Sequence, residues 1–125
     1  MKAKTIPVDV KEQVEKIVRR FNETELKELG CSYETRYQRS YLYLDRMEPP
    51  GRSPVCRLKY NGKMNDWEFA IYKYSSDRYD RDEWLFPGIG CVDGTIEGAM
   101  KADLEAYPVS LQGGFDLLSA KRWKV

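Results

Sequence analysis

Histidine is absent from this sequence of 125 residues. Histidine is the commonest general base and metal ligand in enzymes, and it is the side chain that titrates near neutral pH. Its absence excludes Ser-His-Asp triads, Cys-His pairs and zinc sites built on histidine. We therefore expect a non-enzymatic protein with no catalytic residue, no metal ligand and no cofactor.

Cysteine and long apolar runs are also scarce. The three cysteines, Cys31, Cys56 and Cys91, lie far apart, and no two of them have the spacing of a zinc site or a redox dithiol. No stretch approaches the roughly 20 apolar residues of a membrane-spanning helix, and the first residues lead into no apolar signal segment. These absences predict a cytoplasmic protein with reduced thiols and no membrane partner.

The formal net charge is only +1, so no overall field draws the chain to nucleic acid or to anionic lipid. The charges are nevertheless unevenly placed, because basic side chains outnumber acidic ones in residues 31–74 and the reverse holds in residues 75–108. A hydrophobic content of 42% is that of a folded chain. We expect one α+β domain over residues 1–125, with an N-terminal tail at 1–8 and a C-terminal extension at 109–125.

Four short runs of alternating apolar and polar residues fill the middle of the chain. They cover residues 32–37, 41–46, 55–60 and 67–74, and residues that favour turns separate them. This pattern predicts antiparallel strands with one buried and one solvated face. A polar loop at 75–81 and a fifth short strand at 83–86 are expected to follow.

Two amphipathic helices are expected to flank the strands. The first covers residues 10–29, with Asp9 as its N-cap, Glu12 completing a capping box and Gly30 ending it. The second covers residues 95–107, and Pro108 stops it. Each helix has an apolar stripe of helical period: Val10, Val14, Ile17, Val18 and Phe21 in the first, and Ile96, Met100, Leu104 and Tyr107 in the second.

The two helical stripes and the apolar strand face must bury one another. The simplest solution is a two-layer α+β fold, in which both helices pack on one face of an antiparallel meander of four or five strands. Strand alternation points one set of residues into the core: Leu42, Leu44, Cys56, Leu58, Tyr60, Trp67, Phe69 and Ile71. We expect Leu58 and Phe69 to be nearly fully buried, and Arg57 and Glu68 to be exposed.

The solvated face of the sheet is the main candidate for a binding site. Alternation places rings and cations there together: Arg36, Tyr41, Tyr43, Arg57, Lys59 and Tyr72. Such a face suits single-stranded nucleic acid, because bases stack on rings and phosphates meet cations, and it also suits a protein partner that packs on aromatic anchors. Nucleic-acid binding would require Arg36, Arg57 and Lys59 to converge with Arg39 or Arg52.

Two other interpretations of this face stay open. Tyr beside Arg or Lys on neighbouring strands stabilises an ordinary exposed sheet by ~0.2–1 kcal/mol per pair. Alternatively, the C-terminal extension covers the face with Phe115, Leu117 and Trp123. The partner is left open between protein and nucleic acid, and the oligomeric state between monomer and homodimer.

A second candidate site is the acidic segment at residues 77–83. Asp77, Asp80, Asp82 and Glu83 could serve a small ligand or a histidine-independent enzyme. Arg78 and Arg81 lie between these carboxylates and neutralise them in place. A solvated loop is therefore the simpler interpretation.

The strand region also resembles a known family. The chain has Arg46 followed by Pro49-Pro50, then Ser-Pro-Val-Cys-Arg-Leu-Lys-Tyr at 53–60 and Trp-Glu-Phe-Ala-Ile-Tyr at 67–72. This order is similar to that of the small prokaryotic family of domains of unknown function numbered 3024, over about residues 14–108. Gly51 stands where that pattern has a tryptophan, and the pattern's late histidine is missing. The resemblance implies an α+β fold and no activity.

Overall fold

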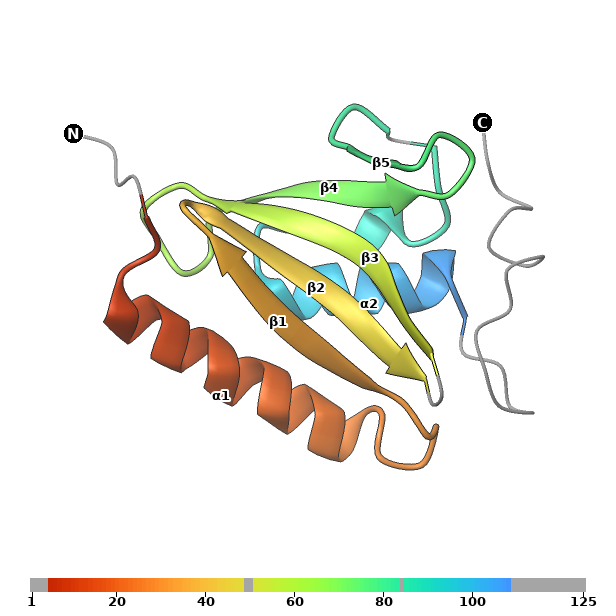
Figure 1. Ribbon diagram of the computed structural model, residues 1–125, viewed down its shortest axis with the longest axis horizontal. Coiled ribbons are helices and arrows are strands. Elements are labelled where there is room, and N and C mark those ends of the chain that lie inside the picture. Colours follow the sequence, from red (N-terminus) through yellow and green to blue (C-terminus); the bar gives the residue numbers. More distant parts are fainter. Residues whose placement is uncertain (1–4, 49–50, 84, 109–125) are drawn as a thin grey trace.

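The computed structural model describes residues 5–48, 51–83 and 85–108, which form two layers (Figure 1). One layer is a five-stranded sheet and the other holds the two helices. In chain order, the elements are α1 (Val8–Thr24), β1 (Ser32–Gln38), β2 (Tyr41–Glu48), β3 (Gly51–Tyr60), β4 (Trp67–Lys73), β5 (Arg78–Asp80), the 3-10 turn η1 (Ile89–Cys91) and α2 (Ile96–Ala106).

The sheet is an antiparallel meander in the order β1-β2-β3-β4-β5. Leu42 pairs with Leu58, and Leu58 pairs in turn with Phe69, so the apolar residues of three strands share one face. Val55 is the extra residue of a bulge between β2 and β3, because Leu44 pairs with Cys56 while Asp45 pairs with Pro54. Such a bulge increases the local twist of a sheet.

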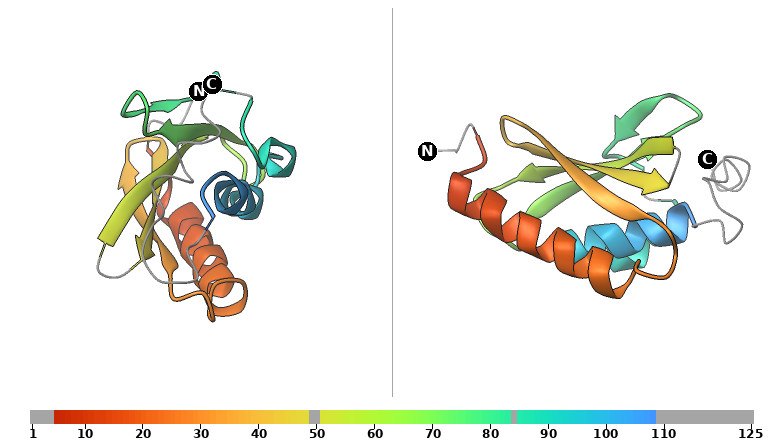
Figure 2. Two further views of the ribbon diagram at one scale, coloured as in Figure 1. Left: turned by 90° about the vertical axis from the view of Figure 1, so that its right-hand side faces the viewer. Right: turned by 60° about the horizontal axis from the view of Figure 1, so that its bottom comes forward.

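Both helices cover the same face of this sheet, as the left-hand view of Figure 2 shows. Helix α1 packs against β1, α2 packs against β3 and β4, and the helices contact each other. The predicted two-layer α+β fold, with an antiparallel meander and both helices on one face, is therefore confirmed.

The core lies between the layers and contains the residues that alternation points inward. Leu42, Leu44, Leu58 and Ile71 are fully or almost fully buried, and Phe69 is 8% exposed. The expected burial of Leu58 and Phe69 is confirmed, as is the exposure of Glu68. Arg57, by contrast, is half-buried, because its guanidinium lies over neighbouring rings.

Helix α1 starts earlier and ends earlier than its sequence pattern predicts. Pro7 is the N-cap, so Asp9 lies inside the first turn and makes no cap hydrogen bond. The helix ends at Thr24 because the next positions of its apolar stripe are polar, whereas Leu26, off the stripe, becomes fully buried once the chain turns. Before the helix, Ile6 is buried and donates its N–H to the carbonyl of Arg39.

The fifth strand also differs from its prediction, since it covers Arg78–Asp80 rather than residues 83–86. It is only three residues long, and charged side chains surround it in the sequence, so no alternation marks it. Tyr72 on β4 pairs with Tyr79 on β5. This pairing adds a ring to the outer face of the sheet.

Helix α2 agrees with its prediction to within one residue at each end. Thr95 is its N-cap, and the Thr95 hydroxyl accepts a hydrogen bond from the N–H of Gly98. The helix also carries Asp103 into the core, where Arg46 reaches from β2. The Arg46 guanidinium donates to the carbonyls of Asp103 and Tyr107 and to the Tyr33 hydroxyl.

Candidate functional site: the outer face of the sheet

The face of the sheet opposite the helices is built by strand register. Tyr41 on β2 pairs with Lys59 on β3, which pairs with Glu68 on β4. One step along, Tyr43, Arg57 and Ala70 form the next cross-strand row. Because residues two apart on a strand share a face, these side chains all project away from the helices.

Four tyrosines form a continuous line of rings on this face. The centroids of Tyr41 and Tyr43 are 6.3 Å apart, those of Tyr43 and Tyr79 are 5.3 Å apart, and those of Tyr79 and Tyr72 are 5.0 Å apart. The rings meet at tilted or edge-to-face angles, which are favourable arrangements for aromatic pairs. We call Tyr41, Tyr43, Tyr79 and Tyr72 the ring row.

Two arginines lie over the ring row. The Arg36 guanidinium carbon is 4.8 Å from the centroid of Tyr43. The Arg57 guanidinium carbon is 4.6 Å from the centroid of Tyr41 and 5.5 Å from that of Tyr79. Cation–π contacts of this kind hold a guanidinium in place while leaving its N–H groups free to donate. The ring row and the two arginines together therefore form a layer of rings and cations.

Asp45 anchors one side of this layer. Its carboxylate is buried and accepts two hydrogen bonds from Arg36, at 2.7 and 3.0 Å, and one from Arg52 at 3.3 Å. Arg52 also pairs with Glu34 at 3.2 Å. The hydrogen bonds to Asp45 raise the pKa of Arg36 above its usual value. Arg36 and Arg52 are thus largely neutralised by carboxylates of the protein itself.

A hollow of about 240 Å³ lies beside the ring row, and the cations that line it are available to a ligand. Arg57 and Lys59 make no ion pair within the described part of the chain, and Arg81 reaches Glu68 only at 3.8 Å. We call this the cationic hollow. It is lined by Tyr41, Arg57, Lys59, Glu68, Ala70 and Arg81.

The structure brings all six predicted side chains into one contiguous arrangement. Tyr41, Tyr43, Arg57 and Tyr72 belong to or lie over the ring row, and Lys59 lines the hollow beside it. Arg36 also contacts the row, but Asp45 pairs with it. Arg52 meets Arg36 on that carboxylate as an ion-pair partner rather than as a free cation. The convergence of Arg36, Arg57 and Lys59 with Arg39 or Arg52, which nucleic-acid binding was expected to require, stays a prediction.

Sequence reasoning missed Tyr79 and Arg81, two residues of this site that lie in or just after β5. Both residues reach this face because residues 78–80 form a strand, where the sequence pattern predicts a loop. Tyr79 lies between two charged residues, Arg78 and Asp80, but three residues are too few for this alternation to mark a strand in the sequence. The C-terminal extension expected to compete for this face lies outside the described residues.

The acidic segment at 77–83 forms internal ion pairs. Lys73 pairs with Glu83 at 2.7 Å and with Asp80 at 3.8 Å, and Arg78 pairs with Asp80 at 3.6 Å. Asp80 also accepts a hydrogen bond from the N–H of Asp82. Within the described ranges, no cluster of three or more Cys, Asp and Glu side chains could hold a metal ion. Asp80 and Glu83 therefore help to fold the segment, whereas the Asp77 and Asp82 carboxylates have no ion pair among the described residues.

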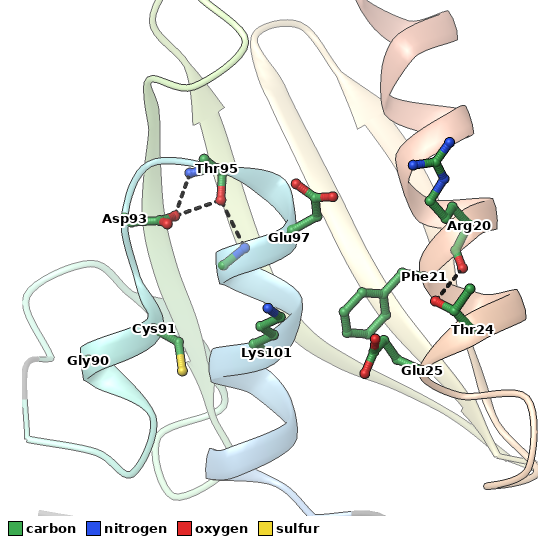
Figure 3. A pocket seen from close by; sticks show the side chains of 11 residues that line it. Arg20, Phe21, Thr24, Glu25, Gly90, Cys91, Asp93, Thr95, Glu97 and Lys101 are labelled. Atoms are coloured by element: carbon green, nitrogen blue, oxygen red, sulfur yellow. Dashed lines mark hydrogen bonds between the residues drawn. The ribbon is translucent and has the colours of Figure 1, made fainter.

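A second cavity, of about 600 Å³, lies on the helix side of the molecule (Figure 3). Its walls come from the end of α1, from the segment leading into α2 and from the first turns of α2. Its charges are mixed in sign: Arg20, Glu25, Asp93, Glu97 and Lys101. The Asp93 carboxylate accepts from the N–H and hydroxyl of Thr95, so both residues cap α2. No residue of the acidic segment at 77–83 lines this cavity.

Comparison with known proteins adds no relative. No protein-family model matches the chain, and no curated protein or solved structure shows significant similarity to it. The resemblance to the family numbered 3024 stays a prediction. Of the helices in the described ranges, none combines the length and the apolar character that crossing a membrane requires.

Proposed function

We propose that this protein is a non-enzymatic binding domain whose outer sheet face contacts a macromolecule, and that single-stranded nucleic acid is the partner class that best fits this face. The observation that carries the proposal is the pairing of the ring row with the cationic hollow. Rings supply stacking surface for bases of any sequence, and cations beside them meet the phosphates.

Charge supports the nucleic-acid version over a protein partner. On this face, Arg36 and Arg52 are paired within the protein, with Asp45. Arg57 and Lys59 instead lie beside rings with no ion pair among the described residues. A protein partner is the second candidate, because tyrosine and arginine are also the side chains that dominate protein interfaces. A small ligand or an enzymatic role for the segment at 77–83 receives no support, because two of its four carboxylates, Asp80 and Glu83, are held in ion pairs.

The experiment is a titration of fluorescently labelled single-stranded DNA and RNA, followed by anisotropy at two salt concentrations. If two or three cations contact phosphates, affinity should fall about tenfold between ~50 mM and ~200 mM salt, because each neutralised phosphate contributes about −0.7 to the slope for single strands. A double variant, Tyr43→Ala with Arg57→Ala, removes a ring and a cation from the face and should lose most of the binding.

The matched control is Lys16→Gln, which removes one exposed cation from α1 on the opposite side of the molecule. It should bind as the wild type does. Circular dichroism melting checks that all variants remain folded. Absence of binding at low salt, or unchanged binding by the double variant, would refute the nucleic-acid version and leave a protein partner as the better account of the face.

A further inference from the structure

We propose that the cationic hollow receives the phosphate monoester at one end of a single-stranded nucleic acid. This inference rests on the proposed function and assigns a role to one part of the outer face. The hollow, rather than the ring row, would then decide which strands bind best. Three observations support it: the charge of the hollow, its floor, and its place relative to the rings.

The charge of the hollow suits a dianion. Three cations, Arg57, Lys59 and Arg81, line it against one carboxylate, Glu68. Glu68 is also a hydrogen-bond acceptor for the Asn61 side chain at 3.3 Å. A phosphate monoester carries about −1.5 to −2 charges at neutral pH, whereas a phosphodiester inside a strand carries one. The excess of two cations therefore matches the end of a strand better than its interior.

The floor of the hollow is the small side chain of Ala70. Ala70 pairs with Arg57 across β3 and β4, and Arg81 follows Asp80, the partner of the next residue, Ile71. A larger side chain at this position would narrow the hollow that both arginines line. Arginine side chains hold phosphate by two parallel N–H bonds, so a gap between two arginines is a favourable place for its oxygens.

The hollow adjoins the ring row at Tyr41, and Arg57, which also lines it, lies over both Tyr41 and Tyr79. Tyr41 is at once a wall of the hollow and the first ring of the row, which continues through Tyr43, Tyr79 and Tyr72. A phosphate held in the hollow would place its own nucleotide beside Tyr41 and the next ones along the other rings. An internal phosphate would instead require the strand to continue beyond Tyr41, past the ring row.

The test compares one short oligonucleotide with three kinds of end: a 5′-phosphate, a 3′-phosphate, and hydroxyl groups at both ends. One of the two phosphorylated strands should bind about tenfold more tightly than the hydroxyl-ended strand, the effect of one net hydrogen bond between charged groups. Inorganic phosphate should compete away this preference without abolishing binding of the hydroxyl-ended strand.

Three variants of exposed or half-exposed side chains test the assignment to the hollow. Lys59→Gln and Arg81→Gln should each reduce the preference for the phosphorylated end. Glu68→Gln should increase it, because it removes the one carboxylate and releases Arg81. A variant that strengthens binding cannot be explained by damage to the fold. Lys16→Gln, on α1, should leave the preference unchanged.

Equal affinity for all three strands, with binding that still depends on salt, would overturn the assignment of the hollow and leave the proposed function in place. Equal effects of Glu68→Gln and Lys59→Gln on the preference would overturn it as well. Failure to bind any strand would overturn the proposed function and this inference together. Tight binding of a phosphorylated peptide in place of every strand would reassign the hollow to a protein partner.

Discussion

Replacing Asp103 by asparagine should remove a large part of the pH dependence of folding stability between about pH 4 and about pH 7. Asp103 lies on α2 with no exposure to solvent. Neither of its side-chain oxygens has a hydrogen-bond partner within the described residues. Burial raises the pKa of Asp103 to about 7, and the nearby Cys56 thiol and Arg46 guanidinium offset only part of that rise.

The sign follows from where the proton is bound. In the unfolded chain the carboxyl has its ordinary pKa near 3.8, so between that value and about 7 the folded state binds a proton that the unfolded state has lost. Wild-type stability should therefore fall as pH rises through this range and level off above it. A difference of roughly three pH units, at about 1.36 kcal/mol each, gives a loss of about 4 kcal/mol.

The assay is urea unfolding of the wild type and of Asp103→Asn at intervals from about pH 4 to about pH 8. Asparagine has the same shape and never ionises, so the variant should gain about 4 kcal/mol on the wild type across the range. Any constant cost of the amide cancels in this comparison. Glu48, whose pKa burial also raises, should leave some pH dependence in the variant.

The control is Asp82→Asn, which removes an exposed carboxylate just after β5. Its stability should keep the wild-type pH dependence. Parallel curves for the wild type and Asp103→Asn would show that Asp103 is ionised in the folded protein throughout the range. In that case Arg46 would be its counter-ion, and the argument from burial would be refuted.

Two further changes test the packing of the fold. Phe69→Ala should cost ~3–5 kcal/mol of unfolding free energy, because Phe69 is buried and stacks on Phe86; a nearly neutral effect in thermal melting would contradict the strand register. Gly94→Ala should cost at least about 1–2 kcal/mol in urea unfolding, because Gly94 has φ of 89° and an added Cβ would lie 2.6 Å from the Asn65 carbonyl oxygen. Wild-type stability in the Gly94 variant would show that this turn relaxes freely.

The two-layer architecture could be predicted from the sequence because its signal is repeated. Alternation along four strands and two helical stripes all point to one core, so an error at one position changes little. The start of α1 differs from its prediction because either Pro7 or Asp9, two residues apart, can serve as the N-cap, and the sequence pattern does not decide between them. A strand of three residues such as β5 has too few positions for alternation to be seen.

The burial of Arg46 and Asp103 could have been predicted from the sequence, although it was not. Arg46 follows Leu42 and Leu44 at the same two-residue spacing, and Asp103 follows Met100 and Ile96 at helical spacing. Each is therefore a charged residue on an apolar face. The cationic hollow had no such signal, since it depends on the register between β3 and β4 and on the path of the chain after β5.

Asp45 and Asp103 are both buried carboxylates, yet they constrain the protein in different ways. Asp45 accepts hydrogen bonds from Arg36 and Arg52, so its charge is compensated where it lies and it fixes Arg36 over Tyr43. Asp103 receives no comparable donor among the described residues, and burial raises its pKa to about 7. The cations of the outer face therefore form two groups. Arg36 and Arg52 are held by Asp45 as part of the structure, whereas Arg57 and Lys59 have no ion pair among the described residues, which is the basis of the proposed binding of an anionic partner.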